Sequence, residues 1–157
     1  MNKKEKLLLA VMRVALGWLM FYAGITKVLN PEWSAAGYAK SAKSLSGLYA
    51  WFAQTGNIEW INFINKWGLT LLGVSLILGI GVRLSSSLGA VLMFSYYLPI
   101  LDFPYVGANS LLVDQHVIYI LTLSFLALTR AGRYYGLEDW FSRTFLAKMP
   151  KFRKIWG

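Results

Sequence analysis

The sequence predicts an all-α membrane protein built as a polytopic bundle of four transmembrane helices. Hydrophobic residues make up 57% of the 157 residues, and the mean hydropathy is +0.48. This apolar share is too high for a soluble domain, whose surface must be mostly polar. The apolar residues also gather into four stretches, each approaching the roughly 20 residues that a helix needs to cross a bilayer. One compact bundle is therefore the simplest organisation of the chain.

The four expected helices are defined by these apolar stretches. They cover residues 7–29, 61–82, 84–101 and 111–129. The first stretch follows basic residues but is longer than the apolar part of a signal peptide and lacks a small-residue cleavage site, so we expect a retained helix. The helices and their connections form one domain over residues 1–137, which is followed by a tail over residues 138–157.

The distribution of basic residues predicts the orientation of the helices. With the N-terminus inside, Lys27, Lys40, Lys43 and Lys66 lie on the outer side, and the other twelve of the sixteen Lys and Arg residues lie inside. Loops rich in Lys and Arg are retained in the cytoplasm. We therefore expect a multi-pass protein of the cell membrane with both termini in the cytoplasm.

Two further segments have the composition of chain that lies at the membrane surface. The outer segment over residues 30–66 mixes Trp, Tyr and Phe with Ser, Gly and Lys, which favours short helices at the level of the lipid headgroups. The tail over residues 138–157 interleaves aromatic and basic residues. This pattern predicts an amphipathic helix on the inner leaflet that ends at Pro150.

Composition excludes several kinds of chemistry. The chain has no cysteine, which excludes disulfides, thiolate catalysis and Cys-bound iron–sulfur or zinc sites. Its only histidine, His116, excludes a haem held by two histidines of this chain, and the scattered Asp residues lack metal-ligand spacing. The basic residues lie between and beyond apolar runs, so they indicate anionic lipid rather than nucleic acid as the partner. We expect no metal site and no covalently bound cofactor.

Polar side chains gather at the outer ends of the predicted helices. Lys27 closes the first helix, Asp102 follows the third, and Asn109, Asp114 and His116 begin the fourth. Charges at membrane depth are costly, so they are functional candidates, although Lys27 has the alternative of reaching the headgroups. Residues two apart on a helix point about 200° away from each other, so we expect only one of Asp114 and His116 to face a given point, and one of them to pair with Lys27. His116 is a candidate for proton exchange, or for a hydrogen-bonded interface residue.

The first helix carries one charge and two small residues inside its apolar stretch. Arg13 lies about one turn inside the helix and either reaches the inner headgroups, pairs with a neighbouring helix end, or donates to an anion or a quinone carbonyl. Gly17 and Gly24 are seven residues apart and share a face, which predicts a packing seam against another helix.

Several motifs resemble the DoxX/DoxD family of membrane proteins. They are RVALGW at 13–18, YAGITKV at 22–28 with Pro31 and Trp33 beyond it, GIGVRL at 79–84, VDQHVIY at 113–119 and AGRYYGL at 131–137. The last two look most like the DoxD branch, and the whole pattern spans residues from about 13 to 139.

The resemblance implies a four-helix integral membrane subunit of a quinone-linked redox system. DoxD is a component of thiosulfate:quinone oxidoreductase, which joins two thiosulfates into tetrathionate, passes two electrons to membrane quinone and works with a second subunit, DoxA. The expected cofactor is quinone as electron acceptor, and the expected partners are the lipid bilayer, a DoxA-like or other redox subunit, and a second copy of the chain. The alternative is a non-catalytic scaffold that recruits a redox partner through its basic tail.

Beside this resemblance, the polar residues divide into two candidate sets. The catalytic candidates are His116, Lys27 and Asp114. The candidates for binding substrate or quinone are Arg13, Trp18, Tyr22, Trp33, Asp102, Asn109 and Tyr119. Thiosulfate is a dianion and needs cationic donors such as Lys27 and protonated His116, whereas nearby Asp residues oppose it. A quinone needs an apolar slot with one or two donors at its carbonyls, for which Tyr96 and Tyr97 are also available.

Overall fold

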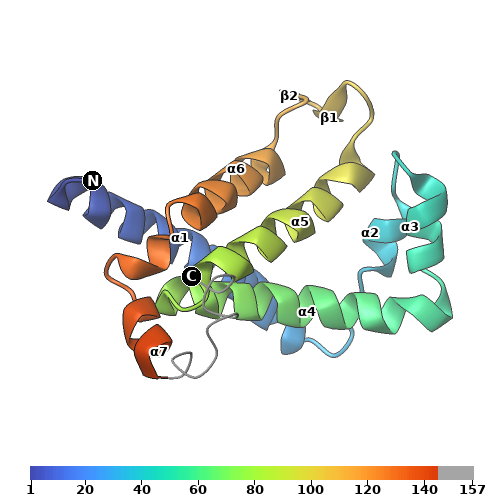
Figure 1. Cartoon of the computed structure of the whole chain (residues 1–157). Coiled ribbons are helices and arrows are strands. Elements are labelled where there is room, and N and C mark those ends of the chain that lie inside the picture. The colour runs from blue at the N-terminus through green and yellow to red at the C-terminus, as the bar shows by residue number, and fades with distance from the viewer. Residues whose placement is uncertain (145–157) are drawn as a thin grey trace.

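A computed structural model describes residues 1–144 of the chain and shows a mostly helical molecule (Figure 1). Its elements are α1 (Lys3–Val28), α2 (Ala36–Lys40), α3 (Ser46–Phe52), α4 (Thr55–Leu78), α5 (Val82–Ile100), β1 (Tyr105–Gly107), β2 (Ser110–Leu111), α6 (Gln115–Leu128), the 3-10 helix η1 (Ala131–Arg133) and α7 (Glu138–Thr144). Two of the described helices, α1 and α4, are long and apolar enough to cross a membrane.

The long helices begin and end at positions that hydropathy does not mark. α1 begins at Lys3 because Asn2 caps it: the Asn2 side chain accepts a hydrogen bond from the Glu5 N–H at 2.9 Å, and the Glu5 carboxylate accepts one from the Asn2 N–H at 2.9 Å. Such reciprocal caps satisfy backbone donors that the first helical turn leaves free. α6 begins at Gln115, later than the expected position 111, because residues up to Leu111 form the antiparallel β1–β2 hairpin.

The connections lie at two ends of the long helices. Figure 1 shows α2, α3 and the β1–β2 hairpin at one end, and α7 and the N-terminus of α1 at the other. The short helices expected within residues 30–66 are present as α2 and α3. Of the tail over residues 138–157, the structure describes only α7, and the expected remainder of its helix with Pro150 lies outside the described residues.

The long helices pack as two pairs, α1 with α4 and α5 with α6, and α4 also contacts α5. The backbones of α1 and α4 lie very close together at several glycines. This confirms the packing seam that was predicted at Gly17 and Gly24. A Cβ atom on Gly24 would clash with the backbone nitrogen of Thr70, and one on Gly73 would clash with the backbone of Phe21. In hydrocarbon, where the hydrophobic effect gives no preference for helix contact over lipid, such close packing is a main source of helix association.

The end of the bundle with α7 contains two buried opposite charges. Arg13 is 1% exposed, and its Nη2 donates to the backbone oxygen of Tyr135 at 3.1 Å. Glu138 is 3% exposed, and its carboxylate accepts a hydrogen bond from the Gly81 N–H at 2.5 Å. The two charges interact electrostatically. Burial raises the pKa of Glu138 above its ordinary value, although the hydrogen bond from Gly81 acts in the opposite direction.

This geometry corrects one expectation for Arg13. Its side chain does not extend toward headgroups, because it is enclosed by the turns at Gly79 and Gly136, where an added Cβ would clash with the guanidinium. Gly79 has a φ of +70°, which favours glycine, and this turn leaves room for the arginine. The guanidinium instead ties the segment that leads into α7 to the first helix.

The glycine contacts generate a stability prediction. We expect Gly73→Ala to lower the free energy of unfolding by about 1–3 kcal/mol, because the added methyl group forces the α1 and α4 backbones apart. The matched control is Gly68→Ala in the same helix, where the new Cβ would meet Leu92 Cδ2 at an ordinary 3.6 Å. Denaturation of both variants in mixed detergent micelles, followed by circular dichroism, measures the difference. Equal stability of the two variants would contradict close packing at Gly73.

Candidate functional site

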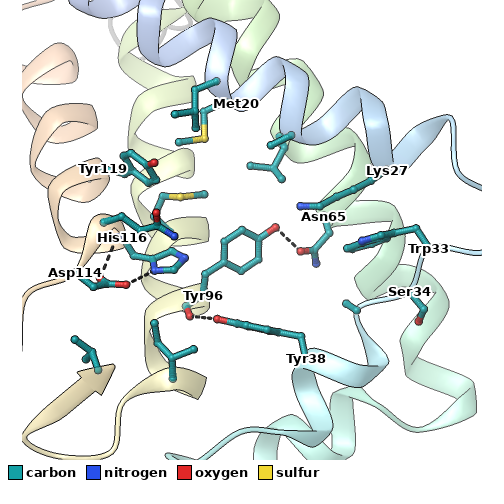
Figure 2. Close-up of a pocket in the computed structure, with 18 of the residues that line it drawn as sticks. Met20, Lys27, Trp33, Ser34, Tyr38, Asn65, Tyr96, Asp114, His116 and Tyr119 are labelled. Carbon is teal, nitrogen blue, oxygen red and sulfur yellow. Dashed lines mark hydrogen bonds and ion pairs between the residues drawn. The ribbon is translucent and has the colours of Figure 1, made fainter. Parts of the chain in front are cut away.

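A pocket of about 850 Å³ lies between the two helix pairs, toward the end that carries α2 and the hairpin (Figure 2). All four long helices contribute to its wall, and residues from α2, the loop before it and the hairpin close one side. Its polar residues are Lys27, Ser34, Tyr38, Asn65, Tyr96, Ser110, Asp114, Gln115, His116 and Tyr119. Its apolar part includes Met20, Leu69 and Met93, which belong to the hydrophobic core. The pocket therefore combines an apolar interior with polar groups contributed by several elements, a combination that is common in ligand sites.

Asp114 and His116 form a hydrogen-bonded pair on the wall of the pocket. His116 Nδ1 lies 2.5 Å from Asp114 Oδ2 (Figure 2). Asp114 Oδ1 also accepts hydrogen bonds from the backbone N–H groups of His116 at 2.9 Å and Val117 at 3.2 Å. Asp114 thus caps α6 and holds the imidazole ring at the same time.

The expectation that these two side chains face different directions was wrong. The angle of about 200° applies only when both residues are helical. Asp114 is the N-cap, and its extended backbone, with φ −127° and ψ −171°, turns its carboxylate back over the first turn of α6. His116 Nδ1 is occupied by this carboxylate, so Nε2 is the ring nitrogen available to a ligand.

Lys27 reaches the pocket from the last turn of α1 and is held by aromatic rings. Its Nζ lies 5.1 Å from the centre of the Trp33 ring and 5.7 Å from that of Tyr96. Lys66 contacts the Trp33 ring as well, at 5.7 Å. Asp114 pairs with His116, and Lys27 has no ion pair within 4.0 Å among residues 1–144, so the expected pairing of Lys27 with Asp114 or His116 does not occur. Cation–π contact takes its place.

Tyr96 stands in the middle of the pocket in Figure 2 and connects three elements. Its hydroxyl donates to Asn65 Oδ1 on α4, while its backbone oxygen accepts a hydrogen bond from the Tyr38 hydroxyl at 2.5 Å. Its ring meets that of His116 edge to face, with centroids 6.1 Å apart. Burial raises the pKa of Tyr38 to about 12, so this phenol remains a neutral donor at physiological pH.

The structure brings together half of the ten residues proposed from sequence. Lys27, Trp33, Asp114, His116 and Tyr119 line the pocket.

The other five lie elsewhere. Trp18 and Tyr22 are 60% and 61% exposed and stack on each other along the outside of α1. Asp102 forms a surface ion pair with Lys43 at 3.2 Å. Asn109 is exposed between β1 and β2, and Arg13 is buried near α7.

Asn65 and Tyr38 are among the pocket residues that were missed from the sequence. Asn65 is a buried amide inside the apolar α4 helix, and its side chain also donates to the Ile61 backbone oxygen at 2.8 Å. An amide inside a helix that is expected to lie in the membrane is a usable signal, because such a group must find a partner inside the protein. Tyr38 gives no comparable signal, since many aromatic residues occur in residues 30–66. In the described residues, no group of three or more His, Asp and Glu is placed to hold a metal ion.

Comparison with known proteins gives one match. The family model described as DoxX matches residues 8–99, which run from the first turns of α1 almost to the end of α5. No curated protein and no solved structure matches the chain. Lys27, Trp33, Asn65 and Tyr96 lie within the matched region, whereas Asp114 and His116 lie beyond it.

The double role of Asp114 generates a second prediction. We expect Asp114→Ala to lower the free energy of unfolding by about 1–2 kcal/mol, because α6 loses its cap. Asp114→Asn should lose less than half as much, since its side-chain oxygen still accepts from the backbone N–H groups. The measurement is denaturation in detergent micelles at neutral pH. If both variants lose the same stability, the cap is not the dominant contribution of this residue.

Proposed function

This chain belongs to the DoxX family of membrane proteins, and on that premise we propose that it is an integral membrane subunit of a quinone-linked redox system. The pocket between the two helix pairs would hold the quinone headgroup. The observation that carries the proposal is the Asp114–His116 pair on the wall of an otherwise largely apolar cavity.

Reduction of a quinone requires two electrons and two protons, and its carbonyl oxygens require hydrogen-bond donors. Protonated His116 presents an Nε2–H to the cavity, while the Asp114 carboxylate at Nδ1 stabilises the positive charge on the ring. Lys27 supplies a second donor from the opposite side of the cavity (Figure 2). The Tyr96 hydroxyl already donates to Asn65, so toward a ligand it acts as an acceptor. His116 is therefore the proposed proton donor, and Lys27 the proposed group that orients the headgroup.

The electron donor that fits the family resemblance is thiosulfate. Two thiosulfate dianions lose two electrons and join as tetrathionate, while the quinone takes up those electrons and two protons to become quinol. Lys27 and protonated His116 offer two positive charges for an anionic donor, and Asp114 offsets one of them. Because the chain contains no cysteine and one histidine, electrons would pass directly from the donor or through a cofactor of a DoxA-like partner.

Activity in membranes tests this function. Purified protein in liposomes that contain a ubiquinone should convert it to ubiquinol when thiosulfate is added, with or without a DoxA-like subunit. We expect His116→Ala to reduce the rate about 100-fold, through loss of the proton donor, and Lys27→Ala to weaken quinone binding. Quinol formation is followed by ultraviolet absorbance, and quinone binding by quenching of tryptophan fluorescence.

The control is Lys43→Ala, which removes only the surface ion pair with Asp102. It should retain the wild-type rate. Quinone binding without thiosulfate oxidation would reject the donor but keep the quinone site. Absence of quinone binding in the wild type would reject the site and favour a scaffold that recruits a redox partner.

We also propose that α1, α4, α5 and α6 all cross the cell membrane, with both chain ends in the cytoplasm. Two of them have the length and composition of spanning helices. α5 has 19 residues, or roughly 28 Å, and α6 has 14, or roughly 21 Å, which is short for a full crossing. The excess of Lys and Arg at the α7 end supports the orientation. In this arrangement the pocket opens in the outer half of the bundle.

Cysteine labelling tests the orientation without background, because the chain has no native cysteine. A membrane-impermeant maleimide should label Ser41→Cys, between α2 and α3, in intact cells. It should label Lys4→Cys and Arg83→Cys only after the membrane is permeabilised. Labelling of Arg83→Cys in intact cells would reject the proposed orientation.

A further inference from the structure

The helices that line the pocket pack against one another on some sides of it but not on all. α1 is packed on α4, and α6 is packed on α5, but α1 and α6 are not paired with each other. Both nevertheless line the pocket, α1 through Leu19, Met20, Ala23 and Lys27, and α6 through Gln115, His116 and Tyr119. The side of the pocket between these two helices is therefore the one that lacks a helix–helix seam.

Leu19 marks this side as an opening. It lines the pocket and is 42% exposed, so no packed neighbour covers this part of the wall. Tyr119, which lines the pocket from α6, is half-buried. If the four long helices span the membrane, the side of the pocket between α1 and α6 faces lipid tails. The apolar side chain of Leu19 suits this environment.

The loop end of the pocket is held closed by polar contacts to the last turns of α5. The Tyr38 hydroxyl donates to the Tyr96 backbone oxygen at 2.5 Å. The backbone N–H of Lys43 donates to the backbone oxygen of Pro99 at 2.8 Å. On the other flank, the Tyr97 hydroxyl donates to the Leu112 backbone oxygen at 2.6 Å. Val106 of the hairpin, which is 8% exposed, lines the pocket from this end. These contacts fasten both the α2 segment and the hairpin over the cavity.

We propose that the ligand of this pocket enters sideways from the hydrocarbon of the bilayer, between Leu19 of α1 and Tyr119 of α6. Its polar head then reaches Lys27 and His116, while an apolar tail stays in the gap between the two helices. The proposal rests on the function proposed above and narrows its substrate class to quinones with a long isoprenoid tail. Such molecules are dissolved in the bilayer, so a lateral opening gives them access without passage through water.

A substitution at the opening tests the route. Leu19→Trp places an indole in the gap without replacing a polar group of the pocket. In lipid nanodiscs, the association rate of a long-chain ubiquinone should fall about tenfold, as measured by stopped-flow quenching of tryptophan fluorescence. A ubiquinone that lacks the isoprenoid tail leaves the gap empty once its headgroup is bound, so its affinity should remain unchanged.

The matched control is Leu8→Trp. Leu8 is 61% exposed and precedes Leu19 by eleven residues, or about three helical turns, so it lies on the same side of α1 but away from the pocket. This variant carries the same additional fluorophore and should bind both quinones at wild-type rates. If Leu19→Trp leaves the association rate of the long-chain ubiquinone unchanged, or lowers the affinity of the tail-less quinone as much as that of the long-chain one, lateral entry is overturned while the quinone site stands. If the wild type binds neither quinone, the function proposed above fails instead.

Discussion

The backbones of α1 and α4 approach each other so closely at Gly24 and Gly73 that a methyl group at either position would clash with the backbone of the facing helix. This contact fixes the rotation of α1 about its axis. Once Gly17 and Gly24 face α4, Met20 and Lys27 must turn toward the space between the two helix pairs, where they line the pocket. The position of the candidate site therefore depends on packing between small residues, which in lipid replaces much of what the hydrophobic effect does in water.

The opposite end of the bundle is held by buried charge. Arg13 and Glu138 are both almost completely buried, and each bonds to a backbone group of a turn that is distant in the sequence. Burial of charge is unfavourable unless hydrogen bonds and opposite charge compensate it. Here the Arg13 bond to Tyr135 joins α1 to the segment before α7, and the Glu138 bond to Gly81 joins α7 to the α4–α5 turn. The RVALGW motif thus contributes a structural arginine rather than a ligand of the pocket.

Hydropathy and residue spacing predicted a helical protein, the short helices between α1 and α4 and the glycine seam, because each follows from local composition. The relation between Asp114 and His116 was not predictable in the same way. It depends on whether residue 114 lies inside the helix or caps it, and the boundary of an apolar stretch does not determine that. The outward direction of Trp18 and Tyr22 followed only once the α4-facing side of α1 was known. The family resemblance is established at the level of DoxX, by the match over residues 8–99.

The positive charge of Lys27 is in contact with aromatic rings rather than with a carboxylate. Its ammonium group rests on the faces of two aromatic rings, with no carboxylate within ion-pair distance in the described part of the chain. A ligand oxygen that reaches it breaks no existing ion pair and meets a positive charge in surroundings of low polarity. Any bound molecule that becomes more negative as it gains electrons is stabilised more in its reduced form than in its oxidised form. The arrangement of Trp33, Tyr96 and Lys27 would thus shift the midpoint potential upward for a bound molecule whose reduction is not matched by proton uptake.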